Sequence, residues 1–360
     1  MKSRFAKAAI LSAMLLGLPL LGILISQKPI GLYLEFPPQT RYIQHAPFSW
    51  VAFGAYGFFV IGIVMIFFVQ SRRAGNHREY REHTQRPFPW WGWMGICWGI
   101  AAWVLAWSRF EWFGKWQPHS FAPLWVGYIL TVNALTYRRK GFCLLSDQTA
   151  YFWRLFPLSA VFWWFFEYLN RFVQNWYYIG PDFGPWEYFW YATLPFSTVL
   201  PAVISTRQYL LSFDWPKNNF QSIFQLNPSH PRLAAWLVLT AAGSGLAGIG
   251  IWPNLFFPLL WVAPLLIIVC LQTLWGEGHI FSNITRGDWH VLVACALSAL
   301  ICGFFWEMWN FLSLAKWRYS IPFVHRFKVF EMPILGYAGY LPFGIECAVV
   351  AEMVRAWYKD

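Results

Sequence analysis

The stretch WWFFEYLNRF (163–172) carries a carboxylate, an amide and a guanidinium inside an almost wholly apolar part of the chain. A second stretch, FFWEMWNFLS (304–313), repeats its Glu-x-x-Asn spacing. Long apolar runs are typical of membrane-spanning helices, and side chains three residues apart share one face of a helix. We therefore expect Glu167 with Asn170, and Glu307 with Asn310, to face the interior of a membrane protein.

The composition supports this interpretation. Hydrophobic residues make up 58% of the 360 residues and charged residues only 12%, whereas a soluble domain carries roughly 25% charged residues. The net charge of +11 does not indicate a nucleic-acid partner, because the basic residues fall in short loops between apolar runs, where they orient a membrane protein. Membrane lipids are the partners that this composition predicts.

Apolar windows predict ten membrane-spanning helices, so the expected fold class is all-α, a polytopic transmembrane helical bundle. The predicted spans lie near 8–26, 48–69, 89–107, 121–137, 150–173, 189–206, 232–250, 255–274, 289–312 and 332–354. The first run follows basic residues and fits either a signal peptide or a retained helix. We favour a retained helix, because no A-x-A-like cleavage site follows it.

The distribution of basic residues predicts the orientation. With the N-terminus in the cytoplasm, 18 of the 27 Lys and Arg residues fall on the cytoplasmic side, as the positive-inside rule requires. Five of these arginines lie in the loop 70–88. We expect a multi-pass protein of a bacterial inner membrane with both termini in the cytoplasm.

The two halves of the chain resemble each other. FAPLW (121–125) matches FPLLW (257–261), and the two Glu/Asn stretches match at a similar spacing. Both are followed by an aromatic-rich segment, a Glu and a Leu-Pro-Phe run. We expect a helix pair in 1–70, a basic cytoplasmic loop in 71–88, and parallel four-helix repeats in 89–231 and 232–360, related by an axis near the membrane normal.

The candidate site residues are the acidic and amide groups of these repeats and the tryptophans around them. The candidate catalytic residues are Glu307, Glu167, Asn310, Asn170, Glu331, Glu187 and Glu346, and the candidate substrate-binding residues are Trp163, Trp164, Trp176, Trp306, Trp309 and Trp317. Arg171, one turn after Glu167, should pair with it and keep it ionised. Glu307 has Phe311 at that position, so it should be protonated more readily and is the preferred acid. Simple helix packing would explain the same residues as well.

No cofactor or metal site is expected. The sequence has no nucleotide-binding motif of the P-loop or G-x-G-x-x-G type and no Zn-type cysteine spacing. The six cysteines are scattered, mostly in apolar runs, which is typical of small buried side chains.

The run FFEYLNRFVQNWYYIGPDFGPWEYFWY (165–191) resembles the lycopene cyclase domain of carotenoid-biosynthesis membrane proteins. The shared order is an acidic residue at a helix end, Trp-x-aromatic, Gly/Pro and a Pro-x-Glu motif, here Glu167, Trp176, Tyr178, Pro185 and Glu187. The second half offers Glu307, Trp317, Tyr319 and Glu331 in the same order. Where the family doubles the last Glu, this chain has Tyr188 and Met332. The resemblance implies an enzyme that handles an isoprenoid carbocation.

Three classes of function fit these observations. The first is an intramembrane acid/base enzyme, cyclase- or isomerase-like, acting on an isoprenoid or lipid, with carboxylates as acids and aromatic rings as cation–π partners. The second is a proton-coupled transporter that uses the same carboxylates. The third is a non-catalytic transmembrane subunit whose tryptophans bind lipid, pigment or partner membrane proteins. A ligand-sized cavity near Glu307 would favour the first class.

Overall fold

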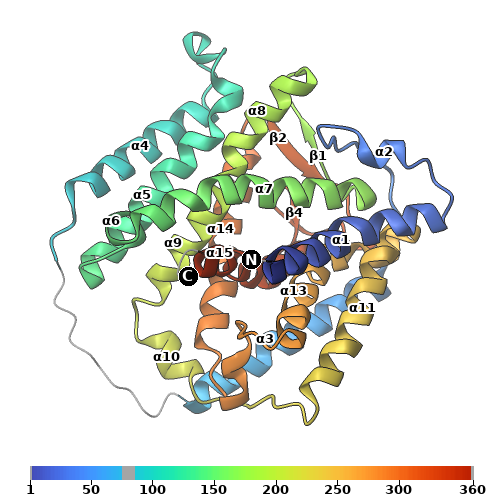
Figure 1. Ribbon diagram of the computed structural model, residues 1–360. Helices are drawn as coiled ribbons and strands as arrows, with labels where there is room; N and C mark the ends of the chain where they lie inside the picture. Colours follow the sequence, from blue (N-terminus) through green and yellow to red (C-terminus); the bar gives the residue numbers. More distant parts are fainter. Residues whose placement is uncertain (1, 75–85, 358–360) are drawn as a thin grey trace.

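The protein is built almost entirely from helices. The computed structural model describes residues 2–74 and 86–357. The long helices are α1 (Lys2–Ile25), α3 (Trp50–Ala74), α4 (Trp90–Trp107), α5 (Phe121–Lys140), α7 (Thr149–Val173), α11 (Pro231–Ile251), α14 (His290–Phe311) and α15 (Tyr340–Trp357) (Figure 1). Most of their limits lie close to the predicted ones. The last one differs, because α15 begins at Tyr340 and not near residue 332.

Several helices are long and apolar enough to cross a membrane. Within the described residues these are α1, α3, α11, α14 and the segment Ile334–Arg355 that contains α15. A sixth span is formed if the segments Pro253–Trp261 and Ala263–Leu274, which meet at an angle of 56°, count as one. These helices account for at most six of the ten predicted spans. Of the predicted loop 71–88, residues 75–85 lie outside the described residues.

Two of the predicted spans are interrupted. The interrupted spans are α8 (Pro185–Phe196) with α9 (Val199–Leu210), and α12 (Pro253–Phe256) with η3 (Phe257–Trp261) and α13 (Ala263–Leu274). Prolines lie at both breaks, and a proline has no backbone N–H for a helical hydrogen bond. At the first break, the Ser159 hydroxyl donates to the carbonyl of Phe196 at 2.6 Å and accepts from the N–H of Leu200 at 3.0 Å. This hydroxyl satisfies backbone groups that the break leaves without helical partners.

Short elements complete the chain. They are α2 (Gly31–Leu34), η1 (Glu111–Phe113), η2 (Gln117–His119), α6 (Leu144–Asp147), α10 (Trp215–Phe220), η4 (Ser282–Arg286) and η5 (Ile334–Gly339), with strands β1 (Trp176–Ile179), β2 (Lys316–Tyr319), β3 (Lys328–Val329) and β4 (Met332–Pro333). Strands β1 and β2 pair in antiparallel fashion, as do β3 and β4. The sequence analysis predicted none of these strands. The β1–β2 pair matters most, because it joins segments that follow α7 and α14.

The core lies where α9 and α14 pack together, and aromatic rings fill much of it. Trp125 on α5 packs against Trp306 on α14, with ring centroids 5.1 Å apart. At the same separation, Trp261 in η3 stacks on Phe166 of α7. Phe343 on α15 is fully buried and contacts both Phe166 and Trp306. The two helices that carry the candidate glutamates are therefore linked through one aromatic cluster.

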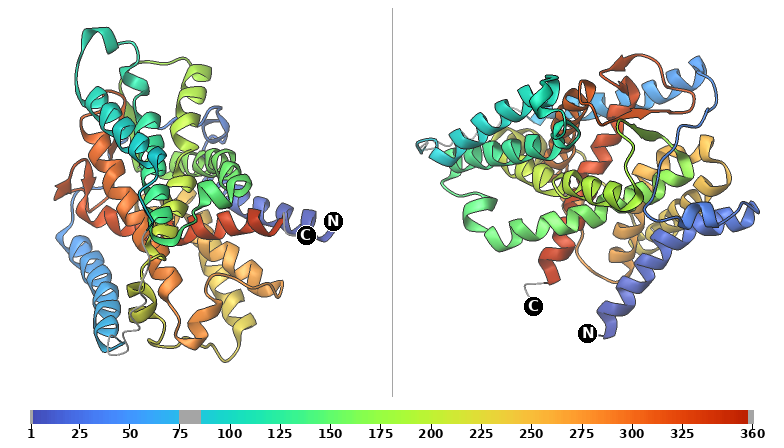
Figure 2. Two further views of the ribbon diagram at one scale, coloured as in Figure 1. Left: turned by 90° about the vertical axis from the view of Figure 1, so that its left-hand side faces the viewer. Right: turned by 90° about the horizontal axis from the view of Figure 1, so that it is seen from above.

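Helix α3 stands apart from this core, at one edge of the molecule (Figure 2). No residue from Trp50 to Arg73 is buried. Aromatic contacts hold its two ends: Phe53 packs against Phe327, and Phe67 against Trp289. The middle of α3 lies between these two attachments and forms one wall of the cavity described below.

Candidate functional site

Glu167 lies near the end of α7 and is fully buried, as predicted. Its Oε1 accepts three hydrogen bonds: from the indole N–H of Trp163 at 3.1 Å, from that of Trp176 at 3.0 Å, and from the hydroxyl of Tyr178 at 2.6 Å. Its Oε2 is buried and has no partner among the described residues. Trp163 comes from the preceding turn of α7, whereas Trp176 and Tyr178 come from β1. The carboxylate therefore ties the strand to the helix.

Glu307 occupies the corresponding place on α14 and is also fully buried. Its Oε1 accepts from the hydroxyls of Tyr319 at 2.6 Å and Tyr340 at 2.8 Å. The indole of Trp317 donates to the Tyr319 hydroxyl at 2.8 Å. Tyr340 reaches this position because Gly303 has no side chain: a Cβ there would lie 2.4 Å from the Tyr340 ring. Glu307 Oε2, like that of Glu167, is buried without a partner among the described residues.

The two asparagines bind the strand backbone. The Asn170 amide donates to the carbonyl of Trp176 at 2.8 Å, and its Oδ1 accepts from the N–H of Asn175 at 2.7 Å. Asn310 donates to the carbonyl of Trp317 at 2.9 Å and accepts from the N–H of the same residue at 2.9 Å. Both amides are fully buried. Each asparagine thus shares a face with its glutamate, as predicted, and positions the strand that supplies the donors.

The pairing of β1 with β2 brings the two sites together. Trp176 lies opposite Tyr319, and Tyr178 lies opposite Trp317. Each Trp-x-Tyr segment therefore pairs with the other in a reciprocal way, Trp against Tyr at both positions. The sequence segments that follow α7 and α14, far apart along the chain, form one two-stranded ribbon (Figure 1). This ribbon supplies donors to both buried carboxylates.

The strand tyrosines are held in their protonated, donating form. Burial raises the pKa of Tyr178 well above its usual value, and the charge of Glu167 raises it further. The pKa of Tyr319 is raised in the same way, first by burial and then by Glu307. Desolvation and a nearby negative charge both disfavour a phenolate. Each phenol is therefore kept neutral, and its hydroxyl donates to its glutamate.

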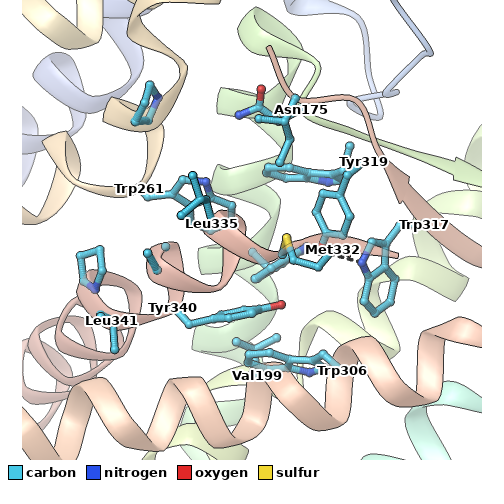
Figure 3. A pocket seen from close by; sticks show the side chains of 18 of the residues that line it. Asn175, Val199, Trp261, Trp306, Trp317, Tyr319, Met332, Leu335, Tyr340 and Leu341 are labelled. Carbon is cyan, nitrogen blue, oxygen red and sulfur yellow. Dashed lines mark hydrogen bonds between the residues drawn. The ribbon is translucent and has the colours of Figure 1, made fainter. Parts of the chain in front are cut away.

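A cavity of about 1410 Å³ lies beside the ribbon and is closed on one side by α3. Its tryptophans are Trp163, Trp176, Trp306 and Trp317, which the sequence analysis predicted, together with Trp261 and Trp289. Tyr319 and Tyr340 also line it, as Figure 3 shows. The volume exceeds the roughly 300–1,000 Å³ of usual small-molecule sites. The cavity is large, aromatic and mostly apolar.

The glutamates are not among the described residues that line this cavity. They lie behind the wall that Tyr178, Tyr319 and Tyr340 form, and each of these three tyrosines donates to one of them. A ligand in the cavity would therefore meet the tyrosine hydroxyls first. The carboxylates set the orientation of these hydroxyls.

Two of the predicted substrate-binding tryptophans lie outside the cavity wall. The indole of Trp164 donates to the Thr193 hydroxyl at 2.9 Å, and its ring stacks on Phe189. Trp309 is buried against Trp125. Trp164 lies elsewhere because it directly follows Trp163, and a helix turns each successive side chain by about 100°. Trp309 lies one turn beyond Trp306 on the same helix face, where the Trp125 ring packs against both of them and buries Trp309 in the core.

The predicted ion pair between Arg171 and Glu167 is wrong. The Arg171 guanidinium instead donates to the backbone carbonyl of Glu35, in the segment between α1 and α3. Glu167 receives neutral donors in place of the cation. The predicted difference in ionisation between Glu167 and Glu307 therefore loses its basis.

The three remaining acidic candidates do not join the two sites. Glu187 is exposed at the start of α8. Glu331 is bound by Lys316 at 2.6 Å, with Arg318 at 3.7 Å. Glu346 on α15 is buried, its Oε2 has no partner among the described residues, and it is not a lining residue of the cavity. The matching positions of these residues in the two halves of the sequence therefore did not predict where their side chains point.

The tyrosines are site residues that were not predicted from the sequence. Tyr178 and Tyr319 each follow a Trp by two residues in the matching segments of the two halves. That shared Trp-x-Tyr pattern was the available signal, because alternate residues of a strand point to the same side. No comparable signal exists for Tyr340, which reaches Glu307 from another helix.

Comparison with protein-family models, with curated proteins and with solved structures finds no match.

Proposed function

We propose that this chain is a multi-pass membrane protein that binds an elongated hydrophobic ligand, an isoprenoid or another lipid, in its aromatic cavity. The observation that carries the proposal is the cavity of about 1410 Å³ with its six tryptophans. Its wall on one side is α3, in which no residue from Trp50 to Arg73 is buried. A hydrocarbon chain in the bilayer would reach this cavity beside α3 without passing through water.

The membrane arrangement is part of the same proposal. The ten-span bundle, the bacterial inner membrane and cytoplasmic termini follow from the apolar runs and the basic loops. The start of α1 and the end of α15 lie on the same side of the molecule (Figure 2), which supports a common location for both termini. The reciprocal β1–β2 pairing supports two repeats related by a local twofold axis.

Analysis of what the purified protein carries tests ligand binding. Organic extraction followed by mass spectrometry should recover a long-chain compound enriched over the bulk membrane lipids. Ala296 lines the cavity from α14, so Ala296→Phe should reduce the recovered amount severalfold. The matched control is Ala55→Phe on α3, where Ala55 is exposed and is not a lining residue. Equal recovery from wild type and both variants, or recovery of bulk lipids alone, would refute the proposal.

A second candidate, an acid/base enzyme acting on the bound ligand, is favoured by the tyrosine hydroxyls. Tyr340 and Tyr319 line the cavity and both donate to Glu307. A proton could pass between Glu307 and the ligand through such a hydroxyl. Glu167 and Tyr178 would form a second pair of the same kind. The resemblance to lycopene cyclase domains makes an isoprenoid the natural substrate class for this chemistry.

The substitution Glu307→Gln separates the two candidates. Its amide oxygen can still accept from both tyrosines, so the protein should remain folded and keep its ligand. If Glu307 takes part in proton transfer, the variant should hold an unreacted precursor while the wild type holds an isomer of it. Identical extracts would leave ligand binding in place and exclude the enzyme.

A further inference from the structure

Three polar atoms at the cavity have no hydrogen-bond partner among the described residues. They are Thr40 Oγ1, Asn175 Oδ1 and the Tyr188 hydroxyl, and all three are buried from solvent. Each residue lines the cavity, and Figure 3 shows Asn175 at one end of it. Buried polar atoms nearly always have partners. Three partnerless atoms on one cavity wall therefore point to a ligand group that would bind them.

The three residues come from segments that pack together. The backbone N–H of Arg41 donates to the Gln174 side chain at 2.8 Å, so the segment with Thr40 lies beside Asn175. The ring of Tyr188 lies 6.2 Å from that of Tyr178, on the strand that follows Asn175. Phe36, earlier in the same segment, packs against Phe189. The segments that carry the partnerless atoms thus lie together at this end of the cavity.

Few charged groups line the cavity, and none of the described cations there is free. Lys316 is held by Glu331 at 2.6 Å and also donates to the carbonyl of Phe311. Burial lowers the pKa of His119, which favours its neutral form. Asp182 carries the remaining charge of the lining residues and would repel an anion. A phosphate or carboxylate head would find no uncommitted cation on this wall.

We propose that this end of the cavity binds the hydroxyl head of an uncharged long-chain alcohol, with the chain lying along the tryptophans. The inference rests on the proposed function and specifies the ligand class of the same site. An amide oxygen only accepts hydrogen bonds, whereas a phenol can donate. A ligand hydroxyl has both functions that these atoms need, because it can donate to the Asn175 oxygen and can accept from the Tyr188 hydroxyl. A hydrocarbon would leave both atoms unsatisfied.

The test uses the full chain in lipid nanodiscs and probes that differ only in the head. Hexadecanol, hexadecane and hexadecyl phosphate compete with bromine-labelled hexadecanol, whose binding quenches the cavity tryptophans. After correction for partitioning into empty nanodiscs, hexadecanol should compete best. Tyr188→Phe removes a hydroxyl without a protein partner, so the fold should be kept. This substitution should lower the affinity for hexadecanol roughly threefold to tenfold, the effect of one hydrogen bond. The affinity for hexadecane should stay unchanged.

Tyr151→Phe is the matched control, because Tyr151 lies on α7 and is not a lining residue; its affinities should equal those of the wild type. Two results would overturn the proposed hydroxyl site but leave binding of the hydrocarbon chain in place. One is stronger competition by hexadecyl phosphate than by hexadecanol, and the other is an equal loss of affinity for hexadecanol and hexadecane in Tyr188→Phe. An unchanged affinity of Tyr188→Phe for hexadecanol would also overturn it. If the bromine-labelled hexadecanol does not quench the tryptophans at all, the proposed binding of a long-chain ligand is itself refuted.

Discussion

The sites at Glu167 and Glu307 both supply hydrogen-bond donors to a buried carboxylate, but the donors come from different residues. Four positions before Glu167, Trp163 donates its indole to the carboxylate. Four positions before Glu307 stands Gly303, and the space above it holds the ring of Tyr340 from α15, whose hydroxyl makes the equivalent bond. A buried carboxylate requires donors, but any element can supply them. Both Oε1 atoms accept buried hydrogen bonds, three at Glu167 and two at Glu307, and the donor from outside the strand comes from a different element at each site.

This difference has a structural consequence. The Glu167 site is built from α7 and β1 alone, so it is local in sequence. The Glu307 site includes a side chain from α15, so it also holds two helices together. Substitutions at the two sites should therefore separate the features that both share from those found at only one of them.

Removal of the carboxylate itself should have the largest effect. Glu167→Leu leaves two indoles and a hydroxyl buried without an acceptor, and should lower the free energy of unfolding by roughly 3–6 kcal/mol, at about 1–2 kcal/mol for each donor. Glu307→Leu leaves two hydroxyls, which can rotate, and should lose roughly 2–4 kcal/mol. Denaturant unfolding in detergent measures both. A larger loss at Glu307 would contradict this ranking.

The asparagines should be equivalent. Asn170→Ala and Asn310→Ala each remove the side chain that binds the strand backbone, and each should lower the free energy of unfolding by roughly 2–3 kcal/mol. Because β1 and β2 pair with each other, the double variant should lose less than the sum of the single losses. Strict additivity in the double-mutant cycle would mean that the ribbon does not couple the two sites.

Gly303 should be sensitive to a single methyl group. In Gly303→Ala the new Cβ must displace the Tyr340 ring, and we expect a loss of roughly 1–3 kcal/mol together with the Tyr340–Glu307 bond. The control is Gly62→Ala on α3, where a Cβ meets nothing within 4 Å. That change should be neutral or stabilise the protein by up to about 1 kcal/mol. Equal melting temperatures for the two variants would disprove the packing role of Gly303.

Neutralising the acidic residue in the first turn of α8, Glu187, and the one in the loop before α15, Glu331, should change stability by small and different amounts. Glu331→Gln breaks the partly buried pair with Lys316 and should cost about 1 kcal/mol, less at high salt. Glu187→Gln, at an exposed position, should change stability by less than about 0.5 kcal/mol. Thermal unfolding at two salt concentrations measures both effects. If Glu187→Gln proved the more costly, the two positions would have been assigned wrongly.

Much of the helical plan could be predicted from the sequence. Apolar runs gave the position of most long helices to within a few residues, because a backbone in an apolar setting must satisfy its hydrogen bonds internally. The three-residue spacing of Glu167 with Asn170, and of Glu307 with Asn310, gave their common inward faces. Four of the six predicted tryptophans line the cavity. Trp164 lies on a different face of α7, and Trp309 is buried against Trp125 one turn beyond Trp306.

The interruptions could not be located from hydropathy, because an average over a window does not register a single broken hydrogen bond. At the break between α8 and α9, the backbone groups of Phe196 and Leu200 bond to the Ser159 hydroxyl of α7. The partner of Arg171 was likewise misjudged, since the nearest acidic residue along the helix is Glu167 but the guanidinium reaches the backbone of Glu35.

The sequence by itself determined which segments become helices and which polar residues share a buried face. Periodicity along one chain segment fixes these features, because they depend on neighbours a few residues away. Only the tertiary structure decided that Trp176, Tyr178 and Tyr319 meet in one ribbon, that Tyr340 packs over Gly303, and that α3 closes a cavity. These features join residues far apart along the chain. They depend on which surfaces fit together, and local spacing carries no record of that fit.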